Sequence, residues 1–509
     1  MNNYDAIVVG TGNSGLFSAL SLINEGLKVL LLDEHNNIGG MSGYSKIGRF
    51  EFGNSIHNLY LGSESVSDYK LEKVLEQCGV YDEIKLSEVP NLFRVITRDH
   101  DFVMPFGIEE FTKKLNELVP DSIEAVNIFF ELALECREAM KYVKENYKNV
   151  DYNYLKEKYI NFLKVSCYSV SKVLDAIGMP LEAQEIINSM WSFLGNSETQ
   201  ISFVTYATFL LDLIQYGYSV PTYNNYDISL TLLNSYLERG GELKLNSRVV
   251  KILTDDNKVN GVKLEDGTLY YSNNVIVNSS LNNVYGKLLD PSVVPREAFK
   301  NVNRRKLGGR TLTINLGLNR SAEELGLNNY TYLLYQSLDS DVEYSRMKEL
   351  LSGNQIAIVH NIANKDISPV GTCALSLTTI YFEDCFGEYV ENERYFTDVK
   401  EISQRLIDIF EKYTKVKITD YIEEMEIVSP VNNAMVNDYP EGCTYGYLLD
   451  GDDDMLPRIL NKDKENYIEG LFVCGGFDGD VYNYNSSIMS GIDCKDAIMN
   501  NIREEENGR

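Results

Sequence analysis

The fold of this chain is decided by the stretch Tyr4-Asp5-Ala6-Ile7-Val8-Val9-Gly10-Thr11-Gly12-Asn13-Ser14-Gly15. Its apolar, β-branched run at 6–9 predicts a strand buried on both faces of a parallel sheet, and G-x-G-x-x-G follows at once. Residues 16–26 then carry apolar positions along one helical face and end in a glycine, which predicts a helix. A second apolar strand at 29–32 ends at Asp33. Together these features form a complete βαβ dinucleotide-binding fingerprint.

Each residue of the fingerprint has its own physical reason. Gly10 permits the tight turn, Gly12 lets the backbone approach a pyrophosphate, and Gly15 lets the helix pack closely on the sheet. Asp33 can accept hydrogen bonds from a ribose hydroxyl. The residues of this segment expected to bind the dinucleotide are Gly10, Gly12, Ser14, Gly15, Asp33 and Glu34.

The residues that follow indicate which dinucleotide is bound. Gly39-Gly40-Met41-Ser42 come shortly after the acid, and the extended stretch 49–53 follows them. Here the sequence resembles the FAD-binding superfamily of phytoene desaturases, carotenoid isomerases, retinol saturases, amine oxidases and UDP-galactopyranose mutases. The resemblance implies that FAD is the cofactor and that Gly40, Met41 and Ser42 wrap it.

Two later segments resemble the other FAD-binding parts of that superfamily. The first is expected to hold a helix at 229–239, a strand at 242–252, a hairpin of 259–264 with 268–271, and a strand at 274–277. The resemblance places the backbone of Val249 at the adenine. The last segment has a strand and glycine pair within 468–476 and a helix at 486–500, and the resemblance places Gly475, Ser487 and Ile488 at the flavin.

The predicted fold class is therefore α/β, a discontinuous Rossmann-like FAD-binding domain with a mixed α+β substrate domain. Residues 1–67, 221–303 and 416–509 are assigned to the FAD-binding domain, and 68–220 and 304–415 to the substrate domain. The substrate domain is expected to have helices at 123–147, 170–194, 201–215 and 397–413, and strands at 92–106, 311–317, 330–335, 355–360 and 373–381. The helix at 201–215 is very apolar, and we favour a buried helix over peripheral contact with a membrane because Asp212 interrupts it and its flanks are not basic.

The composition of the chain limits the kinds of molecule that it is expected to bind. A formal net charge of −28 argues against nucleic acid and against electrostatic binding to anionic lipid. The 8 cysteines are scattered without C-x-x-C spacing, which favours reduced thiols in the cytoplasm and no metal site. The N-terminus lacks the basic region of a signal peptide, and no apolar run is long enough for a transmembrane helix. The expected partner is a small-molecule substrate.

Catalytic residues are harder to predict because flavin chemistry needs no strong acid–base signature. His57 follows the first FAD segment and has an intrinsic pKa suited to proton transfer, although a structural role fits it equally. Tyr484 lies in a Tyr- and Asn-rich loop at 480–485, where the family pattern has glycine and proline, and could orient the substrate.

Three functions follow from the resemblance. The leading one is an FAD-dependent oxidoreductase that adds or removes hydrogen at a C–C bond of a largely apolar small molecule. The alternatives are a flavin-dependent amine oxidase or dehydrogenase, supported by the polar loop, and a redox-neutral flavin isomerase or mutase. No second dinucleotide fingerprint occurs, so a disulfide-reductase-like NAD(P)H domain is not expected.

Overall fold

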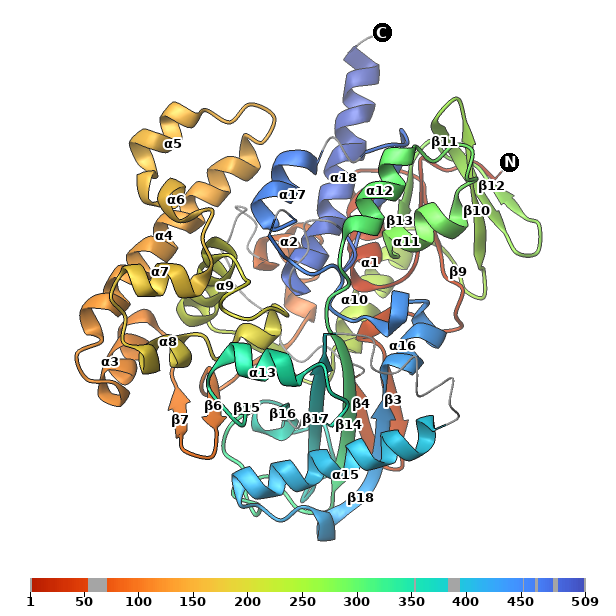
Figure 1. Ribbon diagram of the computed structural model, residues 1–509. Helices are drawn as coiled ribbons and strands as arrows, with labels where there is room; N and C mark the ends of the chain where they lie inside the picture. Colours follow the sequence, from red (N-terminus) through yellow and green to blue (C-terminus); the bar gives the residue numbers. More distant parts are fainter. Residues whose placement is uncertain are drawn as a thin grey trace.

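A computed structural model describes residues 2–53, 71–351, 354–382, 394–451, 453–462, 466–478 and 484–507. Two β-sheets and a helical region organise it (Figure 1). The helices α3 to α9 lie on the left of the view, the predicted dinucleotide-binding strands on the upper right, and a large mixed sheet at the bottom. Within these residues, no helix combines the length and the apolar character needed to cross a bilayer.

The first sheet is parallel and has five strands in the order β19-β13-β1-β2-β9. The glycine turn connects β1 to α1, and α1 packs against both α10 and α18. The predicted strand–helix–strand opening is thus confirmed, and its strands bury their side chains as a parallel sheet requires. The elements are β1 (Ala6–Val9), α1 (Asn13–Asn24), β2 (Val29–Leu32), α10 (Tyr226–Glu238), β9 (Glu242–Lys244), β13 (Val275–Val277), β19 (Leu471–Val473) and α18 (Tyr484–Asn507).

One predicted strand is divided in two. Residues 242–252 form β9 in the parallel sheet and then β10 (Val249–Asp255), which pairs with β11 (Lys258–Leu264) in a separate sheet completed by β12 (Leu269–Tyr270). The break falls at Asn246, which has a φ of 50°, in the left-handed region that a regular strand does not adopt. The backbone there bonds to the segment that follows β2, because Asn246 N–H donates to His35 O at 2.8 Å.

The second sheet is mixed and has seven strands in the order β18-β14-β17-β16-β15-β6-β7. Only β15 and β6 pair in parallel. Along β14, Leu312, Ile314 and Leu316 pack against α15 (Tyr395–Thr414), so the alternate residues Thr311 and Thr313 face away from that helix. The strands are β6 (Phe93–Ile96), β7 (Asp101–Met104), β14 (Arg310–Leu318), β15 (Thr331–Leu334), β16 (Gln355–Val359), β17 (Cys373–Tyr381) and β18 (Ile422–Val428).

Two segments from the predicted FAD-binding domain contact this sheet. β18 belongs to 416–509 by sequence but pairs with β14 along its length, so the boundary at residue 416 separates a strand from its own sheet. The hairpin of β3 (Tyr44–Ile47) and β4 (Phe50–Gly53) packs on the same sheet, where a Cβ on Gly317 would lie 2.4 Å from the ring of Phe50. Gly317 therefore permits the close approach of this hairpin.

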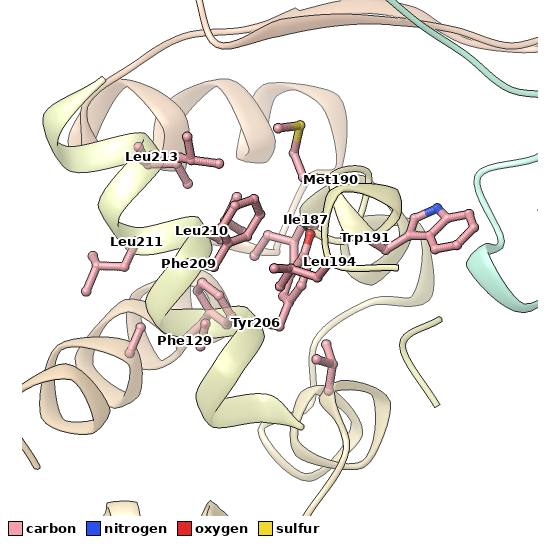
Figure 2. Close-up of a cluster of buried hydrophobic side chains, with 14 of the residues drawn as sticks. Phe129, Ile187, Met190, Trp191, Leu194, Tyr206, Phe209, Leu210, Leu211 and Leu213 are labelled. Atoms are coloured by element: carbon pink, nitrogen blue, oxygen red, sulfur yellow. Dashed lines mark hydrogen bonds between the residues drawn. The ribbon is translucent and has the colours of Figure 1, made fainter. Parts of the chain in front are cut away.

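The helical region is built around a buried helix, α9 (Phe203–Tyr216). Its residues from Phe203 to Ile214 are all buried, as expected for an internal helix. Figure 2 shows Tyr206, Phe209 and Leu210 of α9 near Phe129 of α4 (Ile123–Glu145) and Ile187 of α8 (Leu181–Ile187). Asp212, which interrupts the apolar run, lies 3.5 Å from Arg137 Nη1 of α4.

The predicted helix at 170–194 is broken. It forms α7 (Val170–Ala176) and α8 (Leu181–Ile187), because Gly178 adopts a φ of 73° and Pro180 cannot continue a helix. The other helices of this region are α3 (Ile108–Leu118), α4 (Ile123–Glu145), α5 (Tyr152–Lys158) and α6 (Ile160–Val165). Connecting elements elsewhere are α2 (Leu71–Gln77), β5 (Leu86–Glu88), β8 (Ser219–Pro221), α11 (Leu281–Asn283), α12 (Arg296–Arg304), α13 (Ser340–Arg346), α16 (Pro430–Asn437) and α17 (Met455–Asn461).

Candidate functional site

A cavity of about 630 Å³ is lined both by the glycine turn of the parallel sheet and by one face of the seven-stranded sheet. Its lining near the parallel sheet includes 10–14, 33–35, 39–42 and 248–250. We call the part formed by the seven-stranded sheet and the segments beside it the sheet wall, which consists of Phe193, Phe209, Thr311, Thr313, Ile356, Ile358, Thr378, Thr444 and Tyr445. One cavity therefore joins the predicted dinucleotide site to the predicted substrate domain.

Most of the predicted cofactor-binding residues meet in this cavity. The lining includes Gly10, Gly12, Ser14, Asp33, Glu34, Gly40, Met41, Ser42, Val249, Gly475 and Ser487. Two predicted residues lie behind the lining. A Cβ on Gly15 would lie 2.2 Å from the carbonyl oxygen of Gly10, so Gly15 permits the close packing of α1, and Ile488 is buried in the core beside α1.

Asn278, which follows β13, occupies the space between two of the glycines. A Cβ on Gly12 would lie 2.2 Å from Asn278 Oδ1, and a Cβ on Gly475 would lie 2.1 Å from its Nδ2. The same Nδ2 donates to Cys474 O at 3.0 Å. This cradle has no room for side chains at either glycine and leaves the N-terminus of α1 open to the cavity. It fits a pyrophosphate, whose charge the unpaired N–H groups of a helix N-terminus stabilise.

Asp33 at the end of β2 is buried and strongly hydrogen-bonded. Its carboxylate accepts from Thr11 N at 2.7 Å, from His35 N at 2.9 Å and from His35 Nδ1 at 3.0 Å. Burial would raise the pKa of Asp33, but the hydrogen bonds from His35 and Thr11 outweigh it and hold the pKa below its usual value. Asp33 is therefore a fixed negative charge at the cavity.

His35 carries the matching positive charge. Its hydrogen bond to Asp33 is the main cause that raises the pKa of His35 to about 9, so the ring is protonated at neutral pH and both nitrogens donate. Nε2 donates to the carbonyl oxygen of Val436 at 2.8 Å. Glu34 lies 3.1 Å from Arg248 Nε.

Residues 436–439, at the end of α16, form a strap that contacts the cavity lining at several points. Besides the bond from His35, Asn437 Nδ2 lies 3.7 Å from Met41 Sδ, and Lys287 Nζ contacts the two carboxylate oxygens of Asp438 at 2.7 and 2.8 Å. The ring of Tyr439 packs against Phe477, with centroids 5.3 Å apart. The strap thus connects segments that lie hundreds of residues apart.

The N-terminus of α18 approaches the glycine turn. The hydroxyls of Ser14 and Ser487 lie 2.9 Å apart, and Gly475 N donates to Ser490 Oγ at 2.8 Å. Tyr484 begins α18, but its side chain lies outside the described residues, as does all of His57. Neither proposed catalytic residue is therefore tested by the structure.

The sheet wall is uncharged throughout its described residues. Thr313 Oγ1 and Thr378 Oγ1 lie 2.9 Å apart on adjacent strands, and Thr311 Oγ1 lies 3.3 Å from Thr444 Oγ1. Apolar and aromatic side chains complete the wall, and burial raises the pKa of Tyr445, so its phenol keeps its proton. This part of the cavity offers hydroxyl groups in apolar surroundings.

Sequence reasoning missed Asn278, the threonines and Tyr445. The alternation Thr311-Leu312-Thr313-Ile314 could have revealed a polar face on β14, because successive strand residues point to opposite faces. Which face meets a cavity depends on strand pairing across residues 310–381, and no local pattern shows that.

These features define a flavoprotein in which the dinucleotide-binding cradle and the sheet wall line the same cavity. Residues 13–334 match the family model described as flavin containing amine oxidoreductase, and the chain belongs to that family. It is an FAD-dependent oxidoreductase.

Known proteins resemble the chain along nearly its whole length. It is similar to the all-trans-retinol 13,14-reductase of Danio rerio (23% identical, covering 97% of this chain and 86% of that protein). It is similar to the chloroplastic prolycopene isomerase of Arabidopsis thaliana (23% identical, covering 99% and 84%). Among solved structures, a putrescine oxidase variant has a TM-score of 0.68 at 14% identity, covering 98% of this chain and 99% of that chain, which shows a shared fold.

Proposed function

We propose that this protein adds or removes hydrogen at a carbon–carbon bond of an apolar, uncharged small molecule. The observation that carries this proposal is the neutral sheet wall, whose described residues are threonines, isoleucines and aromatic side chains. Such a wall binds an apolar skeleton by burial and offers no countercharge to an ionic substrate. The names of the similar proteins, a retinol reductase and a prolycopene isomerase, support the same reading.

We assign the cofactor to the cradle as follows. Gly10, Gly12 and the first turn of α1 would hold the pyrophosphate, and the Asp33 carboxylate would bind the ribose. Val249 would hold the adenine, and the remainder would be held by Gly40, Met41, Ser42, Gly475 and Ser487. Gly15 and Ile488 lie behind the lining and help to position α1 through packing. Bound FAD supplies the acceptor or donor of a hydride.

The chain's own residues orient the substrate and keep water away. The apolar part of the sheet wall consists of Phe193, Phe209, Ile356 and Ile358. A substrate skeleton that binds against these side chains displaces water from the cavity. Because this wall holds no ionisable group besides a phenol that stays protonated, a proton for the reaction comes from elsewhere. We keep His57 and Tyr484 as the candidates for that role.

The amine oxidase alternative draws on the similar fold of putrescine oxidase. A protonated amine that is buried without a carboxylate partner keeps a large desolvation penalty. Asp33 and Glu34 lie with the cradle, and no described residue of the sheet wall is acidic. The wall therefore supports the carbon–carbon reading over the amine reading.

We also place the protein in the cytoplasm. The seven described cysteines are free thiols, six of them buried, and this supports a reducing compartment.

The test is to incubate FAD-loaded protein in the absence of oxygen with one compound at a time: all-trans-retinol, prolycopene, 4,4'-diapophytoene or putrescine. Each incubation is done once with oxidised protein and once with protein reduced by dithionite. We expect at least one polyene to gain or lose two hydrogen atoms, detected as a 2 Da shift by mass spectrometry. An isomer of unchanged mass, formed only by reduced protein, would support the mutase alternative. Oxidation of putrescine alone would contradict the proposal.

A further inference from the structure

We propose that Thr313, Thr378 and Tyr445 recognise one uncharged oxygen group, an alcohol, on the substrate. This inference rests on the proposed function, because it assigns a specificity site within the same sheet wall. Its evidence is the count of hydrogen-bond donors and acceptors that the wall leaves open.

The threonine pair leaves one proton available. Thr313 and Thr378 face each other across β14 and β17, and their hydroxyl oxygens are 2.9 Å apart. Two hydroxyls have two protons, and one of these is used between them. Within the described chain neither side chain has another partner, and both residues are more than nine-tenths buried. The second proton is therefore available to a ligand in the cavity.

Tyr445 supplies a second donor on the same wall. Its hydroxyl makes no hydrogen bond to a described residue, and burial keeps it protonated. A Cβ placed on Gly309, which precedes β14, would lie 3.2 Å from the Tyr445 ring and 2.8 Å from Ile380 of β17. The ring therefore lies beside Gly309, which immediately precedes β14, and it lines the same cavity as the threonine pair.

A further threonine pair offers only lone pairs. Thr444 Oγ1 donates to Gly309 O at 3.2 Å and lies 3.3 Å from Thr311 Oγ1. With its own proton on Gly309 O, Thr444 can only accept from Thr311. Both protons are then used, so these oxygens can only accept. The wall thus combines donors with acceptors. An alcohol, which donates once and accepts twice, is a small uncharged group that satisfies both, whereas a ketone or an aldehyde can only accept.

The surroundings exclude a charged group. Ile356 is the register partner of Thr378, and Phe193 and Phe209 line the same cavity. The nearest arginine along β14, Arg310, is turned away from this role because it pairs with Glu441 and donates to Gly308 O at 3.1 Å. A carboxylate or an ammonium would therefore be buried here without a partner.

The absence of the oxygen group has a predictable cost. A hydrocarbon of the same skeleton would bury the wall hydroxyls and leave their donors unpaired, and sites of this kind discriminate strongly against the analogue that lacks the polar group. We expect a preference of about 10-fold or more for the alcohol.

Two matched pairs test this inference: farnesol with its deoxy hydrocarbon, and all-trans-retinol with its deoxy hydrocarbon. Each is titrated into the FAD-loaded protein, and Kd is read from the change in the flavin absorption bands, so no turnover is needed. In the Thr313→Val, Thr378→Val double variant, the alcohol should bind about 10-fold more weakly and the hydrocarbon equally well. Tyr445→Phe should give a smaller loss of the same kind.

Thr379→Val is the matched control. Thr379 is the neighbour of Thr378 on β17, is equally buried, points to the opposite face, and already lacks a hydrogen-bond partner. Its replacement should leave the preference intact, and flavin content and Tm report the folding of every variant. Three results would overturn the inference. The natural protein could bind alcohol and hydrocarbon equally, it could bind neither alcohol, or the double variant could keep the preference for the alcohol. Selective alcohol binding without any hydrogen transfer would instead contradict the proposed function alone.

Discussion

His35 donates its Nε2 proton to the carbonyl oxygen of Val436, 401 residues later in the chain, at a distance of 2.8 Å. The same ring donates from Nδ1 to Asp33, the acid that ends β2. A single protonated imidazole therefore holds the 436–439 strap to the edge of the cofactor cavity. The arrangement depends on two protons, one on each nitrogen.

FAD release should therefore depend on pH. The pKa of His35 is raised to about 9, mainly by its hydrogen bond to Asp33. The stability that this interaction contributes is fully present below pH 6.5, the ordinary value for histidine, and is lost as pH rises through about 9. Above that pH the neutral ring keeps only one proton, so one of its two hydrogen bonds is lost.

We expect the rate of FAD dissociation, followed by the fluorescence of the released flavin, to rise several-fold between about pH 7 and pH 10. His35→Gln should show a fast rate with little pH dependence across this range. A steep dependence that survives in His35→Gln would assign the titration to another group.

Removing the ion pair of the strap should weaken FAD retention more than it lowers the stability of the protein. Lys287 and Asp438 are 58% and 41% exposed, and ion pairs this exposed contribute about 0–1 kcal/mol to folding. Lys287→Ala should therefore change the free energy of unfolding of FAD-free protein by less than about 1 kcal/mol. The dissociation rate of FAD should rise several-fold, because the strap loses a fixed point.

Lys306→Ala offers a comparison for that experiment. Lys306 is also exposed and pairs with Asp450, and neither residue lines the cavity. Its replacement should leave FAD dissociation unchanged, and equal effects of the two variants would argue against a role of the strap.

Two glycines of the fingerprint should separate cofactor binding from folding. Gly12→Ala places a methyl group against the Asn278 side chain, which can move at the cost of its hydrogen bond, about 1 kcal/mol. Its main effect should be loss of FAD, seen as a colourless preparation that retains a cooperative unfolding transition. Gly15→Ala places the methyl group against the backbone of Gly10, so we expect it to cost about 3 kcal/mol of stability as well.

Gly26→Ala is the control for the pair. Gly26 has a φ of 85°, but its added Cβ would meet nothing within 4 Å. It should lower stability by about 1 kcal/mol and keep full FAD content. A yellow Gly12→Ala protein with normal FAD affinity would contradict the pyrophosphate assignment.

The buried pair of Arg137 and Asp212 should behave non-additively. Asp212→Leu removes the buried carboxylate beside Arg137, which keeps Gln215 Oε1 at 2.9 Å and Glu138 at 3.9 Å. We expect it to lower the free energy of unfolding by about 2 kcal/mol in urea titrations. The double variant Arg137→Met, Asp212→Leu removes both charges and should recover most of that loss. A double variant as unstable as the sum of the two single variants would show that the residues act independently.

Local chemistry was enough to predict the opening of the chain. The run at 6–9, the glycine turn and Asp33 each act on near neighbours, so their pattern predicted β1, α1 and β2 correctly. The strand expected at 242–252 was wrong in extent, because Asn246 takes a left-handed conformation to bond with the segment that follows β2. That bond joins residues more than two hundred positions apart, and periodicity cannot reveal it.

The sheet wall was even harder to predict from local sequence patterns. Thr311, Thr378 and Tyr445 come from three separate segments, and only strand pairing places them in one cavity. Asn278 looked like an ordinary residue after a strand, although it lies against both Gly12 and Gly475. The fold class and much of the cradle were predictable, whereas the wall that contacts the substrate was not.

The order of the parallel sheet has a consequence for synthesis of the protein. β1 is synthesised before its partner β13, which follows about 270 residues later, and β19, which completes that edge, comes about 190 residues after β13. Until β13 is made, β1 has no partner on the side away from β2, and until β19 is made, β13 remains an open apolar edge. A ribosome that stalls late would release a chain with an incomplete flavin pocket and a bare strand edge, a natural target for chaperones and proteases.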